Sequence, residues 1–173
     1  MSEQQNDNRL REGYERLLER MQGGANELTW ENLQKDLDDA VEFESELEEY
    51  TKDELALLRA WVERDLKDMR YFMADTGKQV ASWLGIDIDG LSRRVAESLL
   101  SIADRSVVER ERFEEDLEAA RADYCAGEMA APGLMACTHC DAQVMLPTVA
   151  RLEPCHQCGH RYFYRFPNKI IET

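Results

Sequence analysis

The chain has 173 residues, one third of them charged, and a formal net charge of −15 at pH 7. This length suffices for one ordinary domain, or for one domain followed by a module too small to fold on its own core. No window approaches the roughly 18 consecutive apolar residues of a membrane-spanning helix, and the polar N-terminus lacks an apolar signal core. The composition excludes a membrane protein, and we expect a cytosolic one.

The negative charge is unevenly distributed. Residues 133–173 hold four basic and three acidic residues, so the preceding part of the chain carries a net charge of −16. A nucleic-acid-binding surface needs a basic face that releases counterions from the phosphates. Any contact with nucleic acid is therefore expected in the C-terminal part.

The N-terminal part has the periodicity of amphipathic helices. The first predicted helix runs from Asn8 to Gln22, with apolar residues every three or four positions. Thr29 caps a second helix, whose a and d heptad positions form an apolar stripe with one acidic interruption. This stripe consists of Trp30, Leu33, Leu37, Ala40, Glu44 and Leu47. It needs a partner helix, in the same chain or in a second copy.

A third helix is predicted to begin at Thr51, because Thr51 and Glu54 have the spacing of a capping box. Its apolar stripe consists of Leu55, Leu58, Val62, Leu66, Met69 and Met73. The phase of this stripe differs from that of the second helix, which favours a turn near Tyr50. We expect the two helices to form an antiparallel hairpin.

Further helical segments follow. A short continuation to Leu84 and a connector over residues 85–90 lead to a helical stretch with Leu91, Val95, Leu99 and Ile102. Ser106 and Glu109 form another capping box, for a helix that ends near Tyr124. Residues 127–133 are predicted to be a linker.

The segment from Glu42 to Glu54 contains seven acidic residues among thirteen. We interpret it as a solvated helix face that keeps the protein soluble. A docking surface for a basic partner is the alternative, and the sequence does not separate the two.

Four of the five cysteines form two close pairs, Cys137–Cys140 and Cys155–Cys158, with the pattern Cys-x2-Cys-x14-Cys-x2-Cys. Each pair is typical of a tight turn that directs two thiolates at one metal ion, and two such turns complete the tetrahedral sulfur set that zinc accepts. Gly159 follows the second pair, where positive φ is expected. The sequence predicts a zinc site, with iron as the less favoured metal.

Segments of strand composition surround these cysteines, at residues 143–146, 148–152 and 161–166. Together these features predict a mainly α protein. Residues 1–130 form an elongated acidic helical bundle or coiled-coil hairpin, and residues 131–173 form a small β zinc ribbon. So small a module needs the metal in order to fold.

Four cysteines leave no coordination position for water, so we expect a structural metal and no enzymatic activity. The nearby His139, His156 and His160 are expected to be exposed or to act as outer hydrogen-bond donors rather than as ligands. Cys125 is predicted to be a buried, inert thiol near the end of the last helix. Thiol redox chemistry is the least favoured function, because the Cys-x-x-Cys pairs lack a surrounding βαβ pattern.

The last strand alternates two faces. Arg161, Phe163 and Arg165 lie on one face, and Tyr162, Tyr164 and Phe166 lie on the other. We expect the three aromatic residues of the second face to pack into the ribbon core. The first face would then be exposed, and together with Arg151 it could bind single-stranded nucleic acid.

The order of an acidic helical region followed by Cys137-Thr-His-Cys140 and Cys155-His-Gln-Cys158-Gly-His160 resembles the YbeL-like zinc-ribbon-containing proteins of bacteria. The resemblance covers most of the chain. It extends to three helical segments, which are Glu49-Tyr-Thr-Lys-Asp-Glu-Leu55, Arg64-Asp-Leu66 and Arg112-Phe-Glu-Glu-Asp-Leu117. It implies zinc at the four cysteines and implies no particular activity.

Two functions are consistent with these features. The first is a non-enzymatic interaction or adaptor protein, in which the acidic helices and the ribbon contact protein partners. Pairing of two copies through the helical stripes is possible in this case. The second is binding of nucleic acid or of the transcription machinery through Arg151, Arg161 and Arg165.

Overall fold

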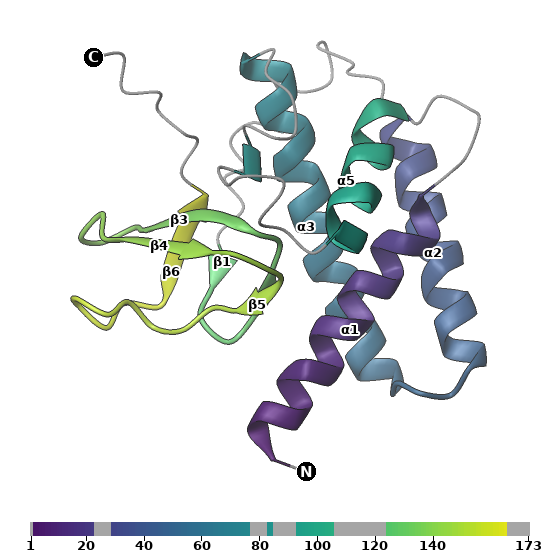
Figure 1. Cartoon of the computed structure of the whole chain (residues 1–173), viewed down its shortest axis with the longest axis horizontal. Coiled ribbons are helices and arrows are strands. Elements are labelled where there is room, and N and C mark those ends of the chain that lie inside the picture. Colours follow the sequence, from purple (N-terminus) through teal and green to yellow (C-terminus); the bar gives the residue numbers. More distant parts are fainter. Residues whose placement is uncertain (1, 23–28, 77–82, 85–92, 106–123, 166–173) are drawn as a thin grey trace.

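A computed structural model describes residues 2–22, 29–76, 83–84, 93–105 and 124–165. Over these residues, four helices pack against one another as a bundle, called the helical layer below, and a small antiparallel β region packs against its side (Figure 1). The predicted fold class, a helical N-terminal part followed by a small β ribbon, is confirmed. No helix in this described part is long and apolar enough to cross a membrane.

Helix α1 (Glu3–Met21) lies at the centre of the helical layer and contacts α2 (Trp30–Glu46), α3 (Lys52–Thr76) and α5 (Arg93–Arg105). It begins before the predicted start at Asn8, because the hydroxyl oxygen of Ser2 accepts a hydrogen bond from the N–H of Gln5 at 3.3 Å. Its buried stripe consists of Leu10, Gly13, Tyr14, Leu17, Leu18 and Met21.

Helices α2 and α3 pack side by side and run in opposite directions, as predicted (Figure 1). The capping box at the start of α3 is formed. The Thr51 hydroxyl oxygen accepts from the N–H of Glu54 at 3.2 Å, and the Glu54 carboxylate accepts from the N–H of Thr51 at 2.8 Å. The hairpin therefore has its turn between Leu47 and Thr51.

The acidic interruption of the α2 stripe, Glu44, is buried. Its carboxylate accepts a hydrogen bond from the Arg20 guanidinium at 2.6 Å, and Arg16 lies 3.6 Å away. Both cations come from α1. The interruption is thus an ion pair between two helices, in which cations from the adjacent helix compensate a buried charge.

The predicted helical stretch with Val95, Leu99 and Ile102 corresponds to α5, and these three residues are buried. The short helical continuation predicted to end at Leu84 is described only at residues 83–84. Its residues 77–82, the connector predicted over residues 85–90 and the helix predicted to start at Ser106 lie outside the described residues. The predicted end of that helix is wrong, since Tyr124 and Cys125 form strand β1. Both residues pair with β6, and this long-range pairing overrides the local helical pattern.

The β region contains a four-stranded antiparallel sheet and a separate two-stranded pair. The sheet has the order β1 (Tyr124–Cys125), β6 (Tyr162–Arg165), β3 (Gly133–Cys137), β4 (Gln143–Leu146). The pair joins β2 (Met129–Ala130) to β5 (Ala150–Arg151). Strand β2 lies in the segment predicted as a linker, so strand pairing crosses the proposed boundary at residues 130 and 131. That boundary stays a prediction.

The β region and the helical layer share an apolar core. Met129, Ala131 and Val149 of the β region belong to the same buried cluster as the helical stripes. A second cluster lies inside the β region and includes Tyr124, Met135, Cys137, Leu146, Leu152 and Phe163. Burial of this surface fixes the ribbon against the helices.

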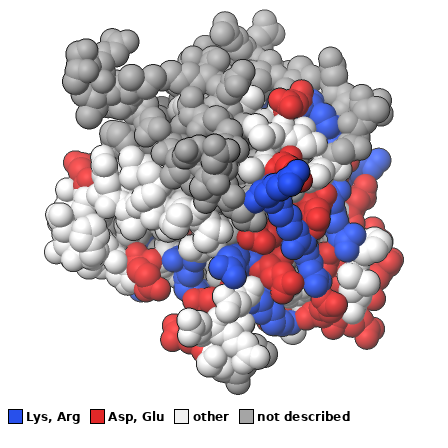
Figure 2. All heavy atoms as spheres, in the orientation of Figure 1, with Lys and Arg blue, Asp and Glu red and all other residues white. Residues whose placement is uncertain are grey.

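Polar contacts reinforce this junction. The Arg64 guanidinium of α3 contacts the Glu128 carboxylate at 2.5 Å and donates to the carbonyl of Met129 at 2.7 Å. Arg151 of β5 contacts the Asp7 carboxylate of α1 at 2.6 Å. Figure 2 shows that charged side chains gather over the helices, whereas the β region on the left is mostly uncharged on this face.

Candidate metal centre

Each pair of cysteines lies in a tight turn of the same construction. The carbonyl of the first cysteine accepts a hydrogen bond from the residue that follows the second cysteine. The distances are 3.0 Å from Asp141 to Cys137 and 2.9 Å from Gly159 to Cys155. Both donors have positive φ, 60° for Asp141 and 74° for Gly159. This confirms the expectation for Gly159 and reveals Asp141 as its counterpart, since Asp tolerates this conformation better than most residues.

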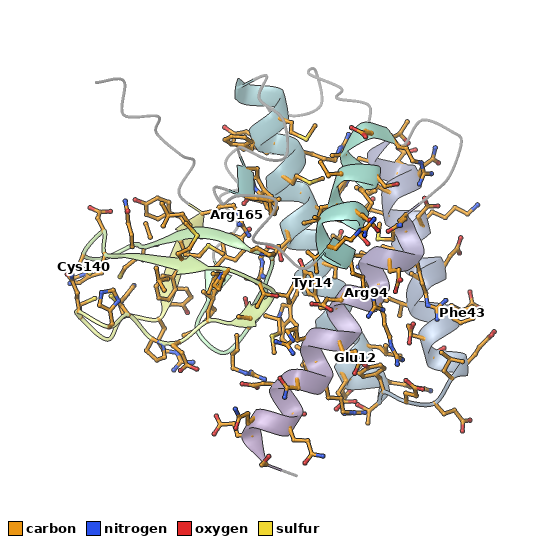
Figure 3. The ribbon with its side chains drawn as sticks, in the orientation of Figure 1. Glu12, Tyr14, Phe43, Arg94, Cys140 and Arg165 are labelled. Carbon is orange, nitrogen blue, oxygen red and sulfur yellow. The ribbon has the colours of Figure 1, made fainter. Side chains whose placement is uncertain are left out.

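The two turns bring the sulfur atoms of Cys137, Cys140, Cys155 and Cys158 within 4.8 Å of one another. The Cys137–Cys158 and Cys140–Cys155 sulfur separations are 3.6 and 3.5 Å. Four sulfurs placed tetrahedrally about 2.3 Å from a zinc ion would be separated by roughly 3.8 Å. A disulfide would need about 2.0 Å, and all five cysteines are free. The arrangement fits a tetrahedral metal site, at the end of the ribbon farthest from the helices (Figure 3).

The thiols of this cluster differ in acidity. Hydrogen bonds from the N–H groups of Cys158 and Gln157 lower the pKa of Cys155 to about 6. The N–H of Ala142 favours the thiolate of Cys140, but burial and the neighbouring thiols outweigh it and raise the pKa of Cys140 to about 12. Without a metal, close thiols cannot all ionise. A dication reverses this, because it stabilises all four thiolates together.

Among the described residues, the group of converging ligand atoms consists of cysteines alone. His139 and His156 are exposed, and His160 is half-buried. The rings of His139 and His160 are 5.4 Å apart, and Tyr162 lies 5.7 Å beyond His160. The contact between His139 and the cluster comes from its backbone N–H, which donates to the Cys137 sulfur at 3.4 Å.

The predicted orientation of the last strand is wrong. Phe163 and Arg165 point inward and are buried, whereas Tyr162 is 49% exposed and Tyr164 is half-buried. Phe163 is the register partner of Cys137, so its face of β6 is the one that covers the metal end of the core. Phe166 lies outside the described residues.

A guanidinium can occupy the inner face because α3 provides acidic partners for it. The Arg165 side chain contacts the Asp68 carboxylate at 3.1 Å and lies 3.5 Å from that of Asp65. It also donates to the carbonyls of Pro132 and Ala131, and stacks 3.9 Å above the Trp83 ring. Burial alone would lower the pKa of Arg165, but Tyr124 and the two carboxylates raise it above its ordinary value.

The two acids have further hydrogen-bond partners. Asp65 accepts from the hydroxyl of Tyr14 and, at 2.9 Å, from the N–H of Ala131. Asp68 accepts from the hydroxyl of Tyr124 at 2.8 Å and from the indole of Trp83 at 3.2 Å. Burial raises the pKa of Asp68, and Arg165 opposes that shift.

The site residues predicted from the sequence do not include these acids, although the sequence carries one signal for Asp65. Asp65 lies three residues after Val62 and four before Met69, so it falls on the buried side of α3. A charged residue at such a position is expected to have a buried partner.

The other basic residues of the predicted nucleic-acid face are also engaged within the chain. Arg161 donates to the carbonyl of Ala126 at 3.0 Å. Arg151 contacts Asp7 and the carbonyl of Gly127. Arg161 is exposed, but Arg151 is half-buried and Arg165 is buried, so the three arginines do not form the predicted exposed basic surface.

Cys125 does not join the metal cluster. It lies in β1 and is partly buried, and its N–H approaches the Glu128 carboxylate at 3.3 Å. Its predicted position at a helix end is therefore wrong, because the residue is part of the sheet.

Residues 22–167 match the family described as zinc-ribbon containing domain. Searches of curated proteins and of solved structures gave no match. The matched range contains both cysteine turns together with α2, α3 and α5, and it covers most of the chain. The protein belongs to this family of zinc-ribbon containing domains.

Proposed function

We propose that this protein is a non-enzymatic, zinc-binding interaction protein of the cytosol, in which a zinc ribbon presents a contact surface to a protein partner. The observation that carries the proposal is an uncharged outer face on the ribbon sheet. The metal shapes this surface and takes no part in chemistry.

Zinc is the metal that we assign to Cys137, Cys140, Cys155 and Cys158. Four sulfurs with this spacing suit a tetrahedral ion, and membership of the zinc-ribbon family supports zinc over iron. Structural zinc contributes on the order of 10–16 kcal/mol to the folding of comparable small units. Because thiolate ligands need a reducing environment, we place the protein in the cytosol.

A structural role follows from the ligand set. Four thiolates close the coordination sphere, so no open position is left for water or substrate. Two surface pockets lined by described residues lie away from the cysteines. One is lined by residues of α1, α2 and α5, and the other by residues of α1 and the β region around β5. Neither places a nucleophile or acid beside the metal cluster.

The outer face of the sheet is defined by strand register. Ala136 pairs with Tyr164 on one side and with Gln143 on the other, so these side chains share one face. Among the described residues, this outer face consists of Cys125, Leu134, Ala136, Gln143, Met145, Tyr162 and Tyr164, of which Ala136 is itself buried. None of these residues is charged, in a protein with a net charge of −15.

This composition is typical of the centre of a protein interface. Interface cores are depleted of charged residues and enriched in Tyr and Met. Tyr162 and Met145 are among the large apolar side chains exposed in the structure. The apolar stripes of the helices are already buried within one chain, so we place the contact surface on the ribbon.

Site-specific photo-crosslinking tests this proposal. A photoreactive amino acid at Tyr162 should give a discrete crosslinked partner in cells, whereas the same group at Leu57, an exposed apolar residue of α3, should not. Met145→Glu should abolish the Tyr162 crosslink, because it places a charge on the outer face. Elemental analysis should find one zinc ion per chain.

Three results would count against the proposal. They are equal crosslinking from both positions, a Tyr162 crosslink that Met145→Glu leaves unchanged, and salt-dependent binding of single-stranded RNA that Arg161→Glu abolishes. The last result would favour the nucleic-acid function instead.

A further inference from the structure

Arg165 connects the metal-binding ribbon to the helical layer. It lies on the same face of β6 as Phe163, which is the register partner of Cys137. Two residues along a strand correspond to about 7 Å. The side chain leaves the ribbon and ends between the carboxylates of Asp65 and Asp68 on α3. Figure 3 shows Arg165 at the junction of the two parts, with Cys140 at the opposite end of the ribbon.

The two acids depend on this cation. Asp65 is 1% exposed, and the ion pair found for Asp68 in the described part of the chain is with Arg165. Arg64, from α3 itself, lies 3.6 Å from Asp65, but its closest contact is with Glu128 of the β region. If Arg165 moved away, the carboxylates of Asp65 and Asp68 would remain buried without enough nearby positive charge to compensate them.

The position of β6 depends in turn on the ribbon. β6 pairs with β3, which ends at Cys137, and it follows directly after the turn that holds Cys155 and Cys158. A metal ion bound to all four cysteines would fix the neighbouring strand β3 at Cys137 and the turn that leads into β6. Without it, a ribbon of this size lacks the buried surface to hold β6 in place.

We propose that Arg165 couples the metal site to the helical layer, so that metal loss at the ribbon locally opens α3 around Asp65 and Asp68. This inference rests on metal binding by the four cysteines. A bound metal holds β6, and β6 holds the cation that keeps the two acids buried. Because coupling between two sites is reciprocal, loss of the Arg165 contacts must also weaken metal binding.

The chain contains a matched control. Glu44 is likewise a buried acid, but its cations, Arg16 and Arg20, both come from α1. Both elements of this ion pair, α1 and α2, belong to the helical layer. Opening caused by metal loss should therefore reach α3 near Asp65 and spare α2 near Glu44.

Hydrogen exchange measured by mass spectrometry on the full chain tests the coupling, with and without a strong zinc chelator. Chelation should increase exchange in the ribbon and in α3 around Asp65–Met69, while α2 around Ala40–Glu44 keeps its protection. Unchanged protection of α3 in a chelated protein with an opened ribbon would overturn the coupling. Equal opening of α3 and α2 would also overturn it, because the effect would then be global unfolding.

Variants separate the coupling from metal binding itself. Arg165→Met should open α3 in the zinc-loaded protein and weaken zinc binding at least about fivefold, as judged by competition with a chromophoric chelator. Arg161→Met should change neither the α3 protection nor the zinc affinity, since the Arg161 side chain donates to the carbonyl of Ala126 within the β region. An Arg165→Met protein with the zinc affinity and α3 protection of the wild type would contradict the proposal.

If Arg165→Met does not fold, the Asp68→Asn variant tests the coupling instead. It keeps an acceptor for Tyr124 and Trp83 but removes the charge, so chelation should open α3 less than in the wild type. An undiminished effect would argue against the coupling. If elemental analysis finds no metal in the purified protein, the metal assignment is wrong. If metal is present and its removal leaves the hydrogen exchange of α3 unchanged, only the coupling is wrong.

Discussion

The guanidinium of Arg165 lies 3.5 Å from the carboxylate of Asp65, and the side chains are only 2% and 1% exposed. The ion pair of Glu44 with Arg20 is closer, at 2.6 Å, and it differs in the exposure of its cation. Glu44 is as deeply buried as Asp65, but the Arg20 side chain is 33% exposed. When its acidic partner is removed, a cation in contact with water loses less stabilising free energy than a cation enclosed in the protein.

Asp65→Asn should therefore destabilise the protein more than Glu44→Gln. Breaking a buried pair by neutralising one partner costs about 3–5 kcal/mol. Loss of a charged hydrogen-bond acceptor whose donors reach water costs about 1–3 kcal/mol. Urea unfolding of both variants, followed by circular dichroism at a helical wavelength, compares the two. If Glu44→Gln lowered the free energy of unfolding as much as Asp65→Asn, exposure of the cation would not determine the cost of breaking the pair.

Two glycines with positive φ provide a second comparison, because one is crowded and the other is not. A Cβ atom on Gly133 would lie 2.0 Å from Arg165 Nη1 and 3.2 Å from the carbonyl oxygen of Leu84. A Cβ atom on Gly159 would meet nothing within 4 Å.

Gly159→Ala should cost about 1–2 kcal/mol, from its backbone conformation alone. Gly133→Ala should cost clearly more, because Arg165 must also move away from its partners. Thermal unfolding of the zinc-loaded variants measures both effects. Similar melting temperatures would mean that Arg165 moves away from the new methyl group without losing its contacts to Asp65 and Asp68.

Local features of the fold could be predicted from the sequence because they depend on a few neighbouring residues. The capping box of Thr51 and Glu54 needs only a spacing of three residues, and it is formed as expected. The cysteine turns likewise follow from Cys-x2-Cys spacing and from the conformational freedom of Gly159. Neither feature requires knowledge of the tertiary structure.

Features that depend on distant residues could not be predicted in this way. Alternation along β6 defines two faces but does not say which face points inward. That choice depends on Asp68, which lies 97 residues from Arg165 in the sequence. The strand conformation of Tyr124 has a similar origin, because its register partner is Phe163. In both cases a tertiary contact outweighs the local pattern.

The capping box also gives a quantitative prediction. Thr51→Ala should destabilise the protein by about 1 kcal/mol, because the N–H of Glu54 loses its acceptor at the start of α3. Ser45→Ala is the control, since its hydroxyl donates to the carbonyl of Glu42 near the exposed end of α2 and should contribute within about 0.5 kcal/mol. Chemical denaturation resolves this difference. Equal effects would argue against a stabilising capping box.

Zinc uptake should release protons and should tighten as the pH rises. In the metal-free cluster the pKa of Cys155 is lowered to about 6, whereas the pKa of Cys140 is raised to about 12 and that of Cys158 is also raised. Near neutral pH, Cys155 is therefore a thiolate, whereas Cys140 and Cys158 keep their protons. Binding to four thiolates must expel both protons, so acid competes with zinc, and release is completed as Cys155 itself becomes protonated. Titration calorimetry in buffers with different ionisation enthalpies counts the protons, and a zinc affinity that does not change with pH would contradict binding through four thiolates.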